Sequence, residues 1–162
     1  MNCRVKVFEG GIIPSKKNDA DACYDMYARS IEVINSNLVK VYLGVALAPE
    51  EGYRVAIYPR SSISKTGWML ANSVGVGDNN YRGEYMAYFV KASGKSCGLS
   101  PCSVEADAWE DHFSPDAEDL FSVGDRVAQM ELVRYNSVEF HEVEDLGVTD
   151  RGIGGFGSTG KR

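Results

Sequence analysis

The chain has 162 residues, of which 44% are hydrophobic and 25% charged, a balance typical of one globular domain with a core of its own. Its formal net charge is -6 and no basic stripe runs along it, so direct binding to nucleic acid is not expected. It has neither a run of about 18 apolar residues that could cross a membrane nor the apolar core of a signal peptide, so we expect a cytoplasmic protein with no membrane partner.

Short strands separated by turns are predicted along the first third of the chain. The stretches whose residue pattern favours strands are 3–8, 24–28, 38–47 and 53–58. The clearest is 38–47, where every second residue from Val39 to Leu47 is Val or Leu. Because side chains alternate along a strand, this pattern predicts one continuous strand with an apolar face.

Arg60, Ser61 and Ser62 directly follow the last of these strands. A guanidinium and two hydroxyls at a strand end, beside free backbone amides, can form a cradle for phosphate. A purely structural interpretation is that Ser61 or Ser62 caps a short helix, which Thr66-Gly67 then ends. The two interpretations are compatible.

A glycine-rich stretch, residues 72–84, lies between two apolar runs, 68–71 and 85–90, and so predicts a β-hairpin. The stretch contains the carboxylate of Asp78 and the ring of Tyr81. Together with the hairpin's backbone amides, these groups suit a flat, polar ligand such as a nucleobase. The alternative is a surface hairpin with an exposed Asp in its turn.

Residues 92–120 hold seven acidic side chains and one Lys, and the rest of the chain is neutral. We interpret this segment as an excursion from the β scaffold, either solvated decoration or a partner-binding or regulatory loop. Beyond it, Gly124-Asp125 predicts a turn, residues 126–135 a strand, and residues 138–144 one further strand. The four cysteines lack metal-ligand spacing and are interpreted as free thiols; they are Cys3, Cys23, Cys97 and Cys102.

The last residues, 151–162, are too rich in glycine to form a stable helix or strand unaided, and we expect them to be mobile while the site is empty. They nevertheless carry a guanidinium, a ring and two hydroxyls, from Arg151, Phe156, Ser158 and Thr159. Glycines let backbone amides approach phosphate oxygens closely, which favours a functional arm. The alternative is a disordered linker end.

Several short strands with turn signals and almost no helix predict an all-β fold, a barrel or sandwich with jelly-roll-like topology. Five blocks of the sequence, taken in order, also resemble the trimeric dUTPase family, the deoxyuridine 5'-triphosphate nucleotidohydrolases. The blocks are residues 22–26, 59–62, 72–84, 124–129 and 151–160. The resemblance implies a distorted β-barrel domain over residues 1–150, with an acidic insertion at about 92–120, a mobile lid arm over residues 151–162, and a homotrimer with shared active sites.

The resemblance also implies an activity, the hydrolysis of dUTP to dUMP and pyrophosphate. That reaction limits uracil incorporation into DNA and supplies dUMP for dTMP synthesis. Asp78 stands where the family has the carboxylate that orients and activates the water attacking the α-phosphorus. Asp25 matches the carboxylate that holds Mg²⁺ through water. In phosphoryl transfer most of the acceleration comes from alignment and charge stabilisation.

The remaining site residues follow from the same resemblance. Arg60, Ser61, Ser62 and Gln129 match phosphate contacts. Asn72 and the hairpin backbone match the uracil reader, with Gly75, Val76, Gly77 and Met86. Tyr81 matches the ring that lies against the deoxyribose and excludes a 2′-hydroxyl. In the arm, Phe156 matches the ring that stacks on uracil, and the residues that clamp the terminal phosphates are Arg151, Gly157, Ser158 and Thr159.

Two positions depart from the family pattern. Cys23 stands where the family usually has Gly, and Gly77 stands where a branched apolar residue usually precedes the catalytic Asp. Two rival functions use the same scaffold: a dCTP deaminase-like enzyme, which needs a general acid/base at the pyrimidine C4, and a nucleotide-sensing regulatory protein. Ammonia release from dCTP distinguishes the first, and a partner that depends on residues 92–120 distinguishes the second.

Overall fold

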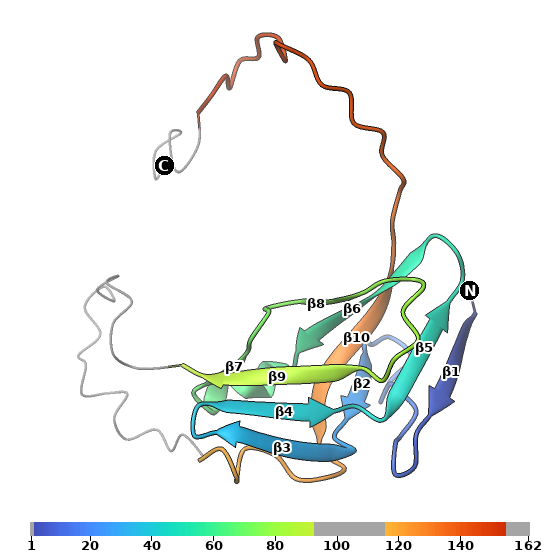
Figure 1. Cartoon of the computed structure of the whole chain (residues 1–162), viewed down its shortest axis with the longest axis vertical. Coiled ribbons are helices and arrows are strands. Elements are labelled where there is room, and N and C mark those ends of the chain that lie inside the picture. Colours follow the sequence, from blue (N-terminus) through green and yellow to red (C-terminus); the bar gives the residue numbers. More distant parts are fainter. Residues whose placement is uncertain (1, 93–115, 155–162) are drawn as a thin grey trace, which may run out of the picture.

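The computed structural model describes residues 2–92 and 116–154, which fold almost entirely into antiparallel strands (Figure 1). The acidic segment, apart from Ala92 and residues 116–120, lies outside these ranges, as do Cys97, Cys102, Phe156, Gly157, Ser158 and Thr159. The elements are β1 (Cys3–Val7), β2 (Tyr24–Tyr27), β3 (Ser30–Asn35), β4 (Leu38–Tyr42), β5 (Val45–Pro49), β6 (Tyr53–Pro59), the 3₁₀ helix η1 (Ser61–Lys65), β7 (Trp68–Leu70), β8 (Gly75–Gly77), β9 (Met86–Lys91) and β10 (Arg126–Arg134).

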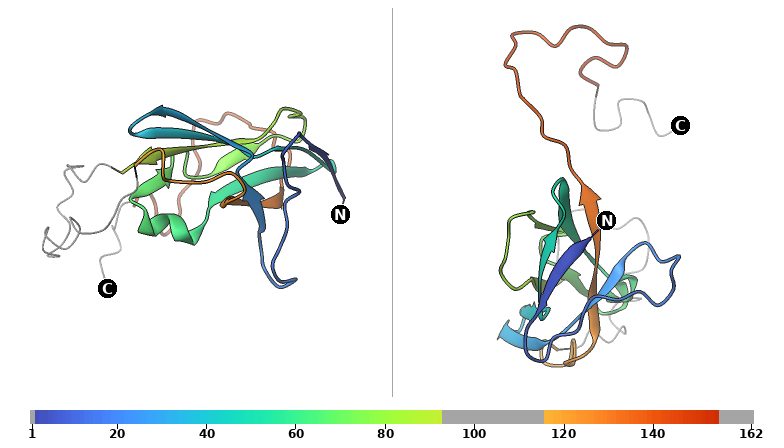
Figure 2. Two further views of the ribbon diagram at one scale, coloured as in Figure 1. Left: turned by 90° about the horizontal axis from the view of Figure 1, so that it is seen from below. Right: turned by 90° about the vertical axis from the view of Figure 1, so that its right-hand side faces the viewer.

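Two four-stranded sheets and one two-stranded sheet make up the body of the described chain. Their strand orders are β2-β10-β6-β8, β3-β4-β9-β7 and β1-β5, and every pairing is antiparallel. Figure 2 shows the sheets curving around a common interior, with η1 at one end. The prediction of an all-β fold is confirmed.

The core lies between the sheets and is filled by alternate side chains of the strands. The largest fully buried side chains are Phe89, Met26, Leu43, Val39, Val41, Val45, Val55 and Val127. Phe89 meets Phe121 edge to face, with ring centroids 4.8 Å apart. Burial of this apolar surface stabilises the fold by roughly 25 cal/mol per Å² and fixes the strand ends that carry polar side chains.

The continuous strand predicted over 38–47 is wrong. The chain turns at Gly44, whose φ is +70°, and so forms two strands, β4 and β5, in different sheets. Gly44 also meets Gly11 backbone to backbone, since a Cβ on Gly11 would lie 2.3 Å from the Gly44 carbonyl oxygen. The predicted apolar face is nevertheless buried, because every second residue from Val39 to Leu47 is at most 4% exposed.

Two further differences concern local structure. Neither serine caps η1: the N-cap residue is Arg60, and it makes no side-chain capping bond. Residues 138–144 form no strand, because they have left the sheets and find no partner strand in the described chain. The predicted hairpin is confirmed, since β7 pairs with β9, but the stretch between them adds β8, which pairs with β6 in the other sheet.

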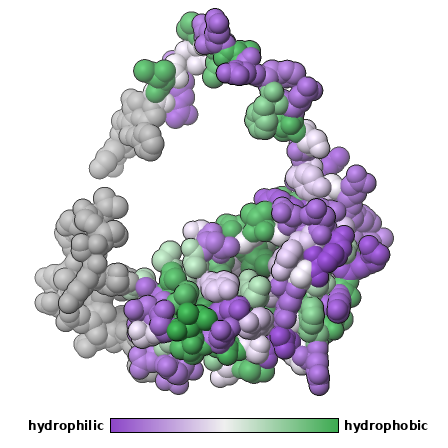
Figure 3. Space-filling model, in the orientation of Figure 1, coloured by the Kyte–Doolittle hydropathy of each residue, from purple (hydrophilic) through white to green (hydrophobic). Residues whose placement is uncertain are grey.

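Residues 136–154 form an extended arm that runs away from the body after β10 (Figures 1 and 2). Just beyond β10, the Tyr135 amide donates to the Gly52 carbonyl at 2.9 Å. Several large apolar side chains of the arm are almost fully exposed, among them Phe140 and Leu146, each at 93% (Figure 3). Within the described ranges, no helix is long and apolar enough to cross a membrane.

Candidate functional site

Three of the predicted site residues meet in one cavity of about 500 Å³. Asp25 lies on β2 and Gln129 on β10, where the two residues are direct cross-strand partners. On its other side Gln129 pairs with Tyr58 of β6. Because β6 ends at Pro59, Arg60 lies just beyond the end of that strand. The cavity is completed by Lys17, Asn18, Asp21, Ala22, Cys23 and Arg126.

The charged side chains that line the cavity carry a net positive charge. Asp25 accepts hydrogen bonds from two guanidinium groups, from Arg60 Nε at 2.9 Å and from Arg126 Nη1 at 3.1 Å. Arg60 also donates to the backbone carbonyl of Arg126 at 3.4 Å, which holds its side chain against β10. Lys17 adds a third cation to the lining, against the two carboxylates of Asp25 and Asp21. An anion with several oxygens, such as a phosphate, suits this arrangement.

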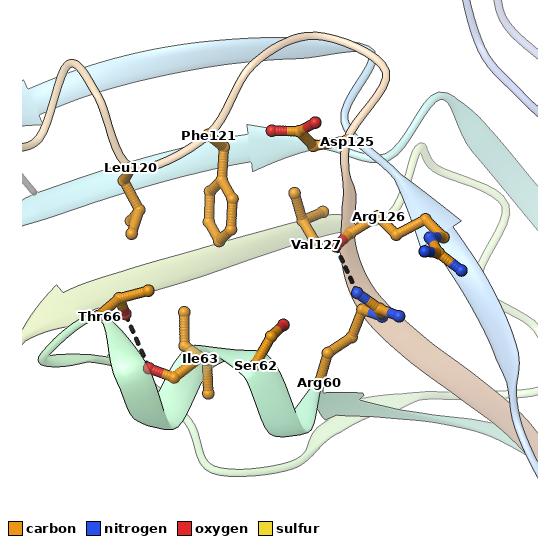
Figure 4. Close-up of a pocket in the computed structure, with 9 residues that line it drawn as sticks. All are labelled: Arg60, Ser62, Ile63, Thr66, Leu120, Phe121, Asp125, Arg126 and Val127. Carbon is orange, nitrogen blue, oxygen red and sulfur yellow. Dashed lines mark hydrogen bonds between the residues drawn. The ribbon is translucent and has the colours of Figure 1, made fainter.

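Arg60 and Arg126 also line a second, adjoining cavity of about 310 Å³ (Figure 4). Ser62 reaches into it from η1, opposite Leu120 and Phe121. Ser61 is exposed at the start of η1, and its carbonyl accepts a 2.7 Å hydrogen bond from Ser64. Of the predicted cradle, Arg60 therefore borders both cavities and Ser62 lines the second, while Ser61 lines neither.

The second group of predicted residues lies on the stretch between β7 and β9. Asp78 and Tyr81 are exposed there, and Val76 is 63% exposed. At the start of this stretch Ser73 has φ +59°, in the left-handed region that non-glycine residues rarely adopt. The strained turn follows Asn72, whose side-chain amide lies beside Gly75. The hairpin thus offers an exposed edge of backbone and side-chain polar groups.

Asn79, next to Asp78, fixes the turn of the hairpin to the body. Its side-chain amide donates to the carbonyls of Pro49, Glu50 and Tyr53, at 3.2, 2.8 and 2.9 Å. These carbonyls belong to the β5–β6 turn. A side-chain NH₂ group has only two protons, so the three carbonyls share them and both protons are engaged.

Glu84 fixes the other end of the same hairpin. Its carboxylate accepts two hydrogen bonds from Arg29, at 2.8 and 3.0 Å, and a third from the Gly44 amide at 2.9 Å. The hydrogen bond from the Arg29 guanidinium to Glu84 raises the Arg29 pKa above its ordinary value. The bidentate pair joins positions 55 residues apart and is partly buried.

Tyr81 folds back over Gly83. Its hydroxyl donates to the Glu84 carbonyl at 3.0 Å, and a Cβ on Gly83 would lie 2.3 Å from that hydroxyl. The ring is therefore held in one orientation, with 39% of the residue exposed. An exposed ring of fixed orientation can support a sugar or a base.

The two groups of residues do not meet within one chain. Gly77, adjacent to Asp78, pairs with Val55, which lies five positions before Arg60. At 3.3 Å per residue, the Gly77–Val55 pair and Arg60 are about 16 Å apart along the direction of β6. Arg151 lies on the arm, where its Nε donates to the Gly154 carbonyl at 3.0 Å.

Sequence reasoning missed four residues of this arrangement. Arg126 and Asn79 each lay within a block that resembles the family, but neither had an assigned role. Arg29 and Glu84 carried no expectation of pairing. No local pattern identifies such pairs, because Asp25 and Arg126 are 101 positions apart and meet only through the pairing of β2 with β10.

The residues of the polar cavity fit a hydrated magnesium ion. The described residues hold no group of three or more acidic, His or Cys side chains that could form an all-protein cage. Mg²⁺ commonly keeps several waters and takes one or two carboxylates together with substrate phosphates. Each oxygen of Asp25 accepts one guanidinium bond and retains another lone pair, so the carboxylate can still accept a bond from a metal-bound water.

Comparisons with known proteins identify the family and the fold of the chain. A family model described as dUTPase matches residues 9–99. Over 159 residues, the chain is 35% identical to the deoxyuridine 5'-triphosphate nucleotidohydrolase of Wolinella succinogenes, covering 97% of this chain and 92% of that protein.

Two solved structures show the same fold. A variant dUTPase of Staphylococcus bacteriophage 80alpha with dUpNHpp gives a TM-score of 0.73 at 22% identity, covering 98% of each chain. A variant dUTPase of S. aureus phage phi11, whose structure details the coordination of a structural Mg(II) ion, gives a TM-score of 0.68 at 20% identity, covering 90% of this chain and 99% of that one.

Proposed function

The chain belongs to the dUTPase family, and from this premise we propose that it hydrolyses dUTP to dUMP and pyrophosphate. The observation that carries the proposal is the convergence in one cavity of Asp25 on β2, Gln129 on β10 and Arg60 just beyond the end of β6. By removing dUTP, such an activity would limit uracil incorporation into DNA and supply dUMP for dTMP synthesis.

The polar cavity and its edge are proposed to bind the triphosphate. Arg60 would contact phosphate oxygens together with Ser61, Ser62 and Gln129. The Gln129 amide already donates to the Pro59 carbonyl at 3.0 Å, which orients its side-chain oxygen and leaves one amide proton for the substrate. Asp25 would hold Mg²⁺ through bound water, and Mg²⁺ would neutralise charge on the phosphates.

Asp78 is proposed to orient and deprotonate the water that attacks the α-phosphorus, with pyrophosphate as the leaving group. Support comes from its position: an exposed carboxylate at the end of β8, on a turn that Asn79 anchors through three carbonyls. Fixed placement of the attacking water against an in-line phosphorus can account for most of the acceleration in such a reaction.

The hairpin is proposed to recognise deoxyuridine. Backbone donors and acceptors around Gly75, Val76, Gly77 and Met86, with the Asn72 amide, would pair with the edge of uracil and mis-pair with that of cytosine. Tyr81 would lie against the deoxyribose and leave no room for a 2′-hydroxyl. Support comes from the exposure of Val76 and Met86 and from the fixed orientation of the Tyr81 ring.

A homotrimer with shared active sites is proposed as the working form. Asp78 and Arg60 lie at opposite ends of the β6–β8 pair, so a site that uses both residues needs at least two chains. The exposed apolar side chains of the arm support docking on another copy, because its own body does not cover them. Arg151 would then act with Phe156, Gly157, Ser158 and Thr159 as a lid over the nucleotide of a neighbouring chain.

The proposal is tested by incubating the full-length protein and Mg²⁺ with dUTP, dCTP, dTTP and UTP in parallel. We expect pyrophosphate from dUTP, little from the other three, and no ammonia from dCTP. Ammonia from dCTP would instead identify a deaminase. In the Asp78→Asn variant, dUTP should still bind while turnover falls about a hundredfold or more. Near-normal turnover in that variant would remove Asp78 from its proposed role.

A further inference from the structure

Gly77, the residue before Asp78, has no room for a side chain. A Cβ placed on it would lie 2.3 Å from the hydroxyl oxygen of Tyr85 and 2.4 Å from the nearest ring carbon. These distances are far below van der Waals contact. The Tyr85 ring therefore occupies the volume that a side chain at position 77 would otherwise fill.

Tyr85 is held rigidly from both sides. It is 5% exposed, and its backbone amide donates to the Val45 carbonyl at 2.9 Å while its carbonyl accepts from the Leu43 amide at 3.0 Å. These bonds fix the residue on the chain segment around Gly44, in the wall of the core. A residue fixed in this way can act as a support for whatever lies against its ring.

Both elements that lie against the ring belong to the proposed site. Gly77 leads directly into Asp78, and the Tyr81 ring meets the Tyr85 ring edge to face, with centroids 5.3 Å apart and planes at 77°. The backbone before Asp78 and the ring assigned to the sugar thus rest on the same side chain. Glycine has the greatest conformational freedom of any residue, so a glycine next to the carboxylate needs external support.

We propose that Tyr85 is a positioning residue, whose ring sets the placement of Asp78 through Gly77 and the orientation of the sugar-facing Tyr81. This inference rests on the proposed hydrolysis of dUTP. It also accounts for the departure at position 77: the space usually filled by a branched side chain there is filled from position 85. Tyr85 itself does not touch the substrate in this assignment.

The hydroxyl of Tyr85 takes part in this role by packing alone. In the described part of the chain it is buried and has no hydrogen-bond partner. Burial, aided by the nearby Tyr81, raises the Tyr85 pKa to about 12. The side chain therefore supports the hairpin by packing, through its ring and hydroxyl oxygen, and not through a hydrogen bond.

The test compares Tyr85→Leu with Phe89→Leu in the full-length protein. Phe89 is a matched control because it is a buried ring in an edge-to-face pair, but its ring partner is Phe121, outside the 72–84 stretch that carries Asp78 and Tyr81. Each variant loses a ring from the core, so both should be less stable. We expect Tyr85→Leu to lower kcat for dUTP about tenfold or more and to weaken the preference for dUTP over UTP about fivefold or more. For Phe89→Leu, both quantities should stay within about twofold of the wild type.

A second comparison combines two substitutions that should compensate for each other, and it also serves if a single variant folds poorly. Gly77→Val alone should collide with the ring and lose activity, whereas Gly77→Val with Tyr85→Leu should recover at least about fivefold in kcat over either single variant. A folded Tyr85→Leu variant with wild-type kcat and sugar preference would overturn the proposal, as would equal loss in Phe89→Leu. Absence of dUTP turnover in the wild type would instead reject the proposed function.

Discussion

Arg60 Nε donates a 2.9 Å hydrogen bond to the carboxylate of Asp25, which joins the end of β6 to β2 across 35 positions. Because β10 lies between these strands, the pair spans the middle of its sheet. The contact brings together a residue assigned to the phosphates and a residue assigned to the metal. Each therefore fixes the other before any nucleotide arrives, which lowers the cost of ordering them on binding.

Replacement of Asp25 by Asn should weaken the apparent affinity of the enzyme for magnesium. The amide keeps the shape but loses the charge that both Arg60 and the hydrated cation require. We expect the Mg²⁺ concentration for half-maximal dUTP turnover to rise about tenfold or more. Asp21→Asn is the matched control, because Asp21 lines the same cavity. An unchanged magnesium midpoint in Asp25→Asn would argue against the assigned role.

Mixing two inactive variants should restore activity if Asp78 and Arg60 serve the same site from different chains. Asp78→Asn and Arg60→Ala, unfolded together in equal amounts and refolded, would assemble at random. About a quarter of the sites would then combine an intact Asp78 with an intact Arg60. The measurement is dUTP turnover per chain. A mixture of Asp78→Asn with Asp78→Ala should recover none, and the same result for the first mixture would refute shared sites.

Asn79→Ala should loosen the turn that carries Asp78. The change removes an amide that serves three carbonyls, and one to two net hydrogen bonds are worth about 1–2 kcal/mol of unfolding free energy. We expect that loss in urea titration, together with a fall in kcat larger than the change in KM. Asn80→Ala, at the exposed neighbouring position, should change both quantities little. Equal effects of the two substitutions would contradict a specific anchor.

Glu84→Gln should destabilise the fold far more than the same change at Glu32. Glu84 accepts three hydrogen bonds in a partly buried site, and a neutral amide cannot accept both guanidinium bonds. We expect a loss of about 1–3 kcal/mol of unfolding free energy. Glu32 pairs with Lys40 at the surface, where solvent screening leaves a salt bridge with little effect on stability. Thermal or urea unfolding of both variants measures the difference.

Tyr85→Phe should remove an alkaline instability. Burial raises the pKa of Tyr85 from 10.0 to about 12, because the neutral phenol is favoured in the fold. The stabilisation from this shift is complete below pH 10 and is lost as pH rises toward 12. The unfolding free energy of the wild type should fall relative to Tyr85→Phe across that window. At neutral pH the variant should be equally stable or more stable, since the hydroxyl has no partner in the described structure.

The sequence predicts well those features that depend on local patterns. Alternation identified the buried face of residues 39–47, the strand predicted after the Gly124-Asp125 turn is β10, and apolar runs around residues 72–84 identified the β7–β9 pairing. Prediction from the sequence failed where a single residue turns the chain but leaves the apolar alternation intact. The apolar alternation runs straight through Gly44, and only the left-handed φ at that position reveals the turn.

The site was predictable as a set of residues but not as an arrangement. Family resemblance identified Asp25, Arg60 and Gln129, and the strand register then placed them in one cavity. That register depends on the packing of whole sheets, which no local pattern encodes. For the same reason the dependence of Gly77 on Tyr85 could not be foreseen. In sequence alone, the glycine is only a departure from the family pattern.

The separation of Gly77 and Arg60 along β6 affects how such an enzyme behaves at low abundance. If a site combines the hairpin of one chain with the arginine of another, a newly synthesised chain is inert until it finds partners. Activity per chain then rises with protein concentration and vanishes on sufficient dilution. The amount of enzyme in a cell would thereby set a threshold for clearing the nucleotide rather than a proportional rate.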